Sequence, residues 1–131
     1  MATIRSESSI ATAASMLMLQ NIGALVVSED GNEVVGILSE RDVVRGMVEH
    51  GRELQDMRVS DLMTRNVKTC TMDSEVTAVM SEMTRGHFRH LPVVEEGSLI
   101  GIVSIGDVVK NRLGELETET SVLRDFIVGR S

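Results

Sequence analysis

The sequence contains a short polar motif twice, each time behind an apolar run. Gly36-Ile37-Leu38-Ser39 is followed by Asp42, and Gly101-Ile102-Val103-Ser104 is followed by Asp107. Each motif is typical of a strand that ends where a helix begins, and the start of a helix favours a phosphate. The serine hydroxyl can bond a phosphate oxygen, and the carboxylate can accept hydrogen bonds from a ribose diol. The motif therefore suits the two polar parts of a ribonucleotide.

The same residues also have a purely structural explanation. Ser39 and Ser104 would cap two helices, and Asp42 and Asp107 would complete a capping box three residues later. That box prefers Glu or Gln at the later position, whereas Asp occurs in both copies. Capping and nucleotide binding are compatible, so both interpretations stay open.

The motif is part of a longer internal repeat. Thr3-Ile4 corresponds to Thr69-Cys70, and Ala24-Leu25-Val26-Val27 corresponds to Leu91-Pro92-Val93-Val94. Two matching sets also have the i, i+3, i+4, i+7 spacing of an amphipathic helix. These sets are Ile10, Ala13, Ala14 and Leu17 in the first copy and Val76, Val79, Met80 and Met83 in the second.

Each copy is predicted to fold as a strand, a helix, two strands and a second helix. A helix between the first two strands favours a parallel crossover, and a Gly97 turn between apolar runs predicts a hairpin. The fold class is therefore α+β, with two β-α-β-β-α repeats in a pseudo-twofold pair plus a C-terminal helix. We assign 1–56 to the first repeat, 57–113 to the second and 114–131 to that helix. In the second repeat the elements are expected at 68–71, 73–84, 91–95, 99–104 and 105–113.

The order of these segments resembles a known family. The doubled motif, the lead-in Val59-Ser60-Asp61-Leu62-Met63-Thr64 and the run Arg89-His90-Leu91-Pro92-Val93-Val94 resemble the CBS domain, named for cystathionine β-synthase. The first repeat has no counterpart of this lead-in ahead of its first strand. The resemblance implies a tandem pair, often called a Bateman module, that commonly dimerises and binds adenosine ligands between its repeats.

The resemblance also implies two ligand sites, each shared between the repeats. Strand residues of one repeat would provide backbone contacts and an apolar slot for adenine, and the motif of the other would hold ribose and phosphate. Site A comprises Thr3, Ile4, Ala24, Leu25, Arg89, His90, Ser104 and Asp107, and site B comprises Ser39, Arg41, Asp42, Thr69, Cys70, Leu91 and Pro92. Arg89 and His90 would face the phosphate in site A. We therefore expect tighter mononucleotide binding there than in site B, which has Arg41 in compensation.

Composition restricts the function classes. The chain has 131 residues, 42% of them hydrophobic, and a net charge of −7, which disfavours nucleic acid as a partner. Its lone cysteine, Cys70, excludes an intrachain disulfide, fits a reduced cytoplasm and is better explained as a small buried hydrophobe than as a reactive thiol. No run is apolar and long enough to span a membrane. No catalytic triad order, metal-ligand spacing or Gly-rich phosphate loop is present, so we expect neither an enzyme nor a metal site.

The C-terminal residues predict a pairing helix. Apolar positions there alternate four and three residues apart, the spacing of a two-helix seam. The seam residues are Val109, Leu113, Leu116, Thr120, Leu123 and Ile127. The helix could fold back on its own module, but we favour pairing with a second chain and expect a homodimer. The Met-rich run 16–19 is apolar on more than one face, which indicates a further packing surface, either between the repeats or between subunits.

These features together predict a regulatory module for energy or redox sensing that binds an adenine nucleotide and acts on a separate protein. AMP is the expected ligand, with ADP, ATP, NAD(H) and S-adenosylmethionine as alternatives. The competing hypothesis is a dimeric scaffold that binds no ligand and keeps its Ser and Asp residues for capping.

Overall fold

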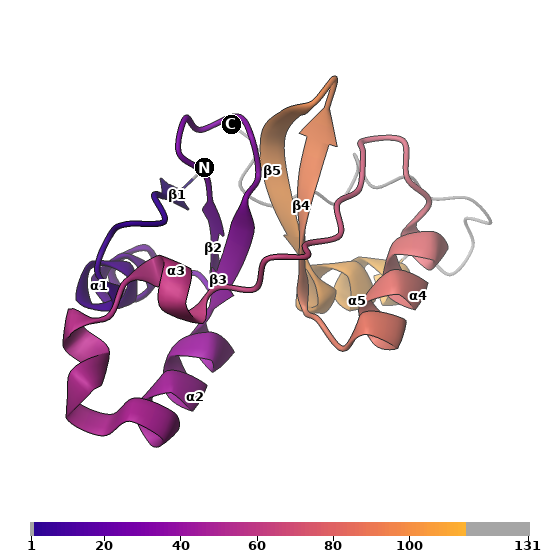
Figure 1. Ribbon diagram of the computed structural model, residues 1–131. Coiled ribbons are helices and arrows are strands. Elements are labelled where there is room, and N and C mark those ends of the chain that lie inside the picture. The colour runs from indigo at the N-terminus through magenta and orange to yellow at the C-terminus, as the bar shows by residue number, and fades with distance from the viewer. Residues whose placement is uncertain (1, 115–131) are drawn as a thin grey trace. The chain divides into compact units, whose positions relative to one another are not determined.

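The computed structural model describes residues 2–114 and the side chains through residue 110 (Figure 1). The chain divides into two compact units, Ala2–Val67 and a second that begins at Lys68. The pairing helix predicted at 114–131 lies outside the described residues except for residue 114. Between residues 2 and 114, no helix combines the length and the apolarity that a membrane crossing requires.

The first unit contains a three-stranded sheet in the order β1-β2-β3. β1 pairs with β2 in parallel, and β2 pairs with β3 antiparallel, which confirms the predicted parallel crossover. The elements are β1 (Thr3–Ile4), α1 (Ile10–Gln20), β2 (Ala24–Val27), β3 (Gly36–Ser39), α2 (Glu40–His50), the 3-10 turn η1 (Gly51–Asp56) and α3 (Val59–Leu62).

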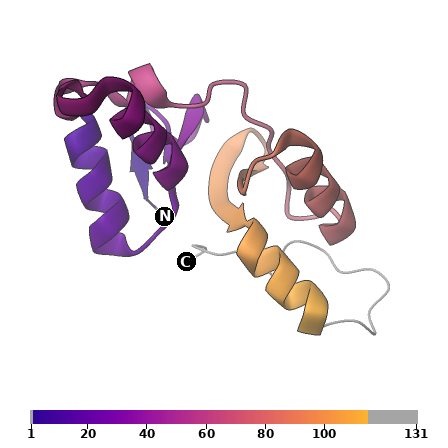
Figure 2. The same cartoon turned by 90° about the horizontal axis from the view of Figure 1, so that it is seen from below.

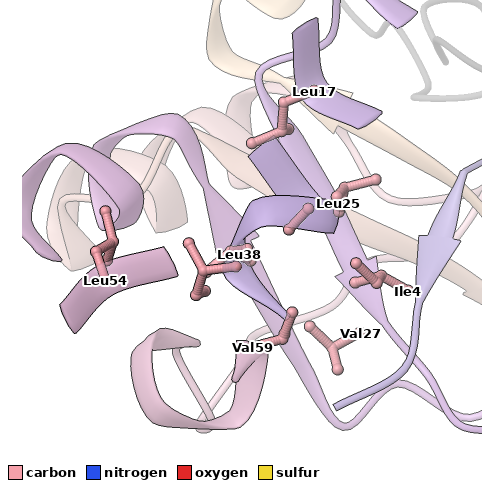
Figure 3. Packing of buried hydrophobic residues seen from close by; sticks show 9 residues of the cluster. Ile4, Leu17, Leu25, Val27, Leu38, Leu54 and Val59 are labelled. Atoms are coloured by element: carbon pink, nitrogen blue, oxygen red, sulfur yellow. The ribbon is translucent and has the colours of Figure 1, made fainter. Parts of the chain in front are cut away.

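The core of the first unit is aliphatic. Leu25 and Val27 of β2 and Leu38 of β3 pack with Leu17 of α1 and with residues of η1 and α3 (Figure 3). Every residue of β2 is buried, so this strand is apolar on both of its faces.

The lead-in segment 59–64 packs on the first unit. Val59 is fully buried in the first core. Thr64 extends the edge of β3, where the Ile37 N–H donates to the Thr64 carbonyl at 3.0 Å and the Thr64 N–H donates back at 2.9 Å. Gly36 allows this close approach, because a Cβ there would lie 2.9 Å from the Met63 sulfur and from the Thr64 carbonyl oxygen. A segment that we assigned to the second repeat thus completes the core of the first.

The second unit is a hairpin with two helices packed against each other (Figure 2). Its elements are α4 (Val76–Gly86), β4 (His90–Glu95), β5 (Ser98–Ser104) and α5 (Ile105–Gly114). The predicted hairpin is confirmed: Glu95 pairs with Ser98. Glu96 and Gly97 between them have φ values of 50° and 80°. Positive φ at both central residues is the requirement of a type I′ turn. The core consists of Cys70, Val76, Val79, Met83, Leu91, Val93, Val103 and Val108.

The strand predicted at 68–71 is reduced to a single parallel bridge between Cys70 and Val93. The Cys70 N–H donates to the Pro92 carbonyl at 3.0 Å, and the Val94 N–H donates to the Cys70 carbonyl at 2.8 Å. The next amide, that of Thr71, donates instead to the Ser74 hydroxyl at 2.9 Å. This local turn ends the ladder and delays the helix, which begins at Val76 and not at the predicted residue 73.

Candidate functional site

The first candidate junction lies where β3 ends at Ser39 and α2 begins. The Ser39 hydroxyl accepts a hydrogen bond from the Asp42 N–H at 3.2 Å. The Asp42 Oδ2 atom accepts from the Ser39 N–H at 2.9 Å and from the Ser39 hydroxyl at 3.1 Å. These reciprocal bonds form a capping box with Asp in place of the usual Glu. The capping interpretation is therefore confirmed for this pair.

Arg45 is a second partner of Asp42 that the sequence reasoning overlooked. Its Nη2 atom donates to Asp42 Oδ1 at 2.5 Å. The side chain of Asp42 is 8% exposed, whereas that of Arg45 is 60% exposed. The i, i+3 spacing of opposite charges on one helix was the signal available in the sequence. The cap and the ion pair together engage both carboxylate oxygens.

The second junction repeats the serine–aspartate contact at the start of α5. The Asp107 N–H donates to the Ser104 hydroxyl at 3.1 Å, and that hydroxyl donates to Asp107 Oδ2 at 2.6 Å. His90 stands opposite Ser104 in the hairpin register. The Ile105 N–H donates to the Arg89 carbonyl at 2.7 Å. Four predicted site A residues therefore meet at one end of the hairpin: Arg89, His90, Ser104 and Asp107.

Backbone hydrogen bonds hold the junction of the first unit in the same way. The Glu40 N–H donates to the Gly23 carbonyl at 3.0 Å, and Ala24 pairs with Ser39. In both units, the residue just before one strand accepts a hydrogen bond through its carbonyl. The donor is the first N–H of the helix that follows the antiparallel partner strand. This fixes the direction in which each helix N-terminus points relative to its own sheet.

Four of the predicted strand residues have their side chains in a core. Ile4 and Leu25 belong to the first core, and Cys70 and Leu91 belong to the second. These side chains are therefore not exposed to a ligand, and the backbone N–H and C=O of Cys70 are already paired with Pro92 and Val94. Each predicted site draws one half from each unit. Thr3, Ile4, Ala24, Leu25, Ser39, Arg41 and Asp42 lie in the first unit, and Thr69, Cys70, Arg89, His90, Leu91, Pro92, Ser104 and Asp107 lie in the second.

The Cys70 thiol is not an activated group. The residue is 7% exposed, and its sulfur lies 3.6 Å from the Pro92 carbonyl oxygen. Burial raises the pKa of this thiol to about 12. The prediction of a small buried hydrophobe is confirmed. Within residues 2–114, no group of three or more His, Cys, Asp or Glu side chains could hold a metal ion.

Comparison with known proteins identifies the family. A model of the CBS domain matches residues 1–49 and residues 59–114. The chain belongs to the CBS domain family. Among curated CBS relatives, a mitochondrial CBS domain-containing protein of Arabidopsis thaliana, CBSX3, is 39% identical over 113 residues, which are 83% of this chain and 55% of the relative. An uncharacterized 17.7 kDa protein of Acidianus ambivalens is 43% identical over 77% of this chain and 60% of its own. The chain thus spans little more than half the length of these two relatives.

Solved CBS structures share the fold. A CBS-domain-containing protein from Agrobacterium tumefaciens has a TM-score of 0.80 and 46% identity, with 85% of this chain and 88% of that chain covered. The CBS domain pair of the protein MJ0100, solved with 5′-methylthioadenosine and S-adenosyl-L-methionine, has a TM-score of 0.73 and 29% identity, with 88% and 91% covered. A two-repeat CBS pair of the α+β class is therefore the fold of this chain.

Proposed function

We propose that this CBS pair is a regulatory module without catalytic activity that binds an adenine nucleotide and thereby acts on a separate protein. The observation that supports it best is the doubled junction at which a serine hydroxyl and an aspartate carboxylate meet at a helix N-terminus. A hydroxyl, the positive end of a helix and a carboxylate are the groups that suit a ribose phosphate. The adenosyl compounds in the related MJ0100 structure support the same ligand class.

The two sites of the proposal are shared between the repeats. In site A, Asp107 would accept hydrogen bonds from the ribose hydroxyls, Ser104 would contact the phosphate, and Arg89 and His90 would face the phosphate. In site B, Asp42, Ser39 and Arg41 would take these roles. We expect site A to bind more tightly, because a nearby guanidinium and imidazole stabilise a phosphate better than one guanidinium alone.

AMP is the proposed ligand, because one or two arginines per site match the small charge of a single phosphate better than they match the triphosphate of magnesium-bound ATP. ADP, S-adenosylmethionine and NAD(H) could place their adenosine half in the same position. Binding would favour one arrangement of the repeats and so report energy or redox state to the partner. We propose that the protein is located in the cytoplasm. The free, buried Cys70 is compatible with the reducing conditions there.

Titration calorimetry with AMP tests the proposal. Asp107→Ala should weaken AMP binding more than Asp42→Ala, and the double variant should bind no AMP. Asp56→Ala, an exposed acidic residue of η1, serves as the charge-matched control and should bind as the parent does. Equal losses from Asp42→Ala and Asp107→Ala would contradict the proposed difference between the sites.

Thermal unfolding separates the sensor from the ligand-free scaffold. A ligand at one hundred times its Kd stabilises the folded state by about 2.7 kcal/mol, which raises the melting temperature. AMP, ADP, ATP, NADH and S-adenosylmethionine would each be supplied at millimolar concentration. If none raises the melting temperature, the scaffold hypothesis replaces the sensor.

A homodimer is the second part of the proposal. Helices α1 and α2 of the first unit expose large apolar side chains, namely Met18, Leu19, Val44, Met47 and Val48. Exposed apolar surface of this kind is typical of a packing interface. The apolar C-terminal spacing described above supports the same oligomeric state.

A further inference from the structure

The carboxylate of Asp42 is already engaged before any ligand arrives. We propose that Arg45 competes with the ribose diol for Asp42, so that site B accepts a nucleoside only when the guanidinium releases this carboxylate. The inference rests on the proposed function, because it concerns the regulation of the same site.

The two oxygens of Asp42 have different partners. Oδ2 belongs to the capping box and accepts the two hydrogen bonds from Ser39. Oδ1 is the oxygen outside the cap, and the Arg45 Nη2 atom donates to it at 2.5 Å. A ribose diol needs carboxylate lone pairs that accept its two hydroxyl hydrogens. Three hydrogen bonds already occupy the carboxylate, which has about four acceptor positions, and the diol needs two of them. The ligand must therefore displace Arg45, because displacing Ser39 would also undo the start of α2.

Arg45 is suited to be displaced. Its side chain is 60% exposed, and exposed ion pairs are weak because water and salt compete for both charges. The side chain lies one turn beyond Asp42 on α2, so the guanidinium can turn into solvent without movement of the backbone. The position that corresponds to Arg45 in α5 is Lys110, a more compact and more strongly hydrated cation that cannot form a bidentate pair. By the chemistry of its side chain, arginine is therefore the stronger competitor for a carboxylate.

Adenosine is the probe that isolates this competition, because it has the ribose diol and no phosphate charge. Titrations would use Asp107→Ala as the parent, so that site B is the site measured. In this parent, Arg45→Ala should tighten adenosine binding by about two- to fivefold, the size expected for removal of one exposed ion pair. The matched control Arg52→Ala removes an exposed arginine of η1 and should leave the affinity unchanged.

Salt dependence gives an independent readout. Added salt screens the Arg45–Asp42 pair, so adenosine should bind the parent more tightly as salt rises, whereas Arg45→Ala should lose this dependence. Unchanged or weaker adenosine binding by Arg45→Ala, in a variant that melts like the parent, would overturn the inference while the proposed function stands. If neither adenosine nor AMP binds the wild-type chain, the proposed function fails and the inference fails with it.

Discussion

At the scale of single residues, short carboxylate contacts organise both the motif and the loops around it. Asp42 closes a capping box, and Glu29 joins two segments through hydrogen bonds. Glu29 accepts hydrogen bonds from the Ser6 N–H at 2.8 Å and from the Ser6 hydroxyl at 2.9 Å. It thereby ties the turn after β1 to the loop after β2. Hydrogen bonds to the charged form of a carboxyl lower its pKa.

Glu29 should titrate below its ordinary range. The backbone and hydroxyl bonds from Ser6 lower the pKa of Glu29 from its usual 4.5. A lowered pKa in the folded state means that the stabilisation is present above the unfolded-state pKa and is lost as the pH falls through the folded-state pKa. Titration of the Glu29 side chain by NMR should give a midpoint under 4.5, and Ser6→Ala should raise it. If the midpoint of Glu29 stays in place in Ser6→Ala, the hydrogen bond from the Ser6 hydroxyl to Glu29 does not form in solution, because this variant keeps the Ser6 N–H.

At the scale of elements, glycines decide how closely helices and strands approach. Gly46 of α2 faces Leu62 of α3 and Leu54 of η1. A Cβ at Gly46 would lie 2.7 Å from a Leu62 methyl carbon and 2.8 Å from a Leu54 methyl carbon. Gly106 of α5 is different, since the nearest atom to its Cβ would be the Ser104 hydroxyl oxygen at 3.9 Å.

Gly46→Ala should therefore destabilise the first unit, although alanine is the better helix former. Overpacking costs about 1–3 kcal/mol, whereas the gain in helix propensity is at most about 1 kcal/mol. Gly106→Ala should be neutral or stabilising by up to about 1 kcal/mol, because the added methyl group meets no close atom. Urea unfolding of both variants measures the difference. If Gly46→Ala and Gly106→Ala had equal free energies of unfolding, the two leucines would move aside without cost.

At the scale of the whole molecule, each unit has its own aliphatic core, and apolar surface remains outside both cores. All residues of the first core precede Lys68, and all residues of the second follow it. The exposed apolar side chains of α1 and α2 lie outside these cores. The homodimer proposed above would cover such a surface.

Deletion of residues 115–131 should convert the proposed dimer to a monomer or yield an unstable protein, because it removes most of the apolar stripe. Light scattering gives the molar mass, and circular dichroism shows whether the shortened chain still folds. Leu123→Lys in the full chain is the matched single substitution and should weaken the dimer without removing the segment. A folded, shortened chain with the mass of the full dimer would refute a role for the stripe.

The sequence by itself was sufficient to predict the repeat, the hairpin, the crossover and the capped strand-to-helix junctions. Periodicity, turn residues and caps act over a few residues, and the repetition of a motif strengthens each local interpretation. The tertiary structure alone showed that 59–64 packs on the first unit and that the ladder at Cys70 is one residue long. It also showed which rotamer of Arg45 brings its guanidinium to Asp42, a contact that the i, i+3 spacing allowed but did not fix. The packing of 59–64 and the length of the ladder depend on which distant backbone groups meet, and local patterns do not contain that information.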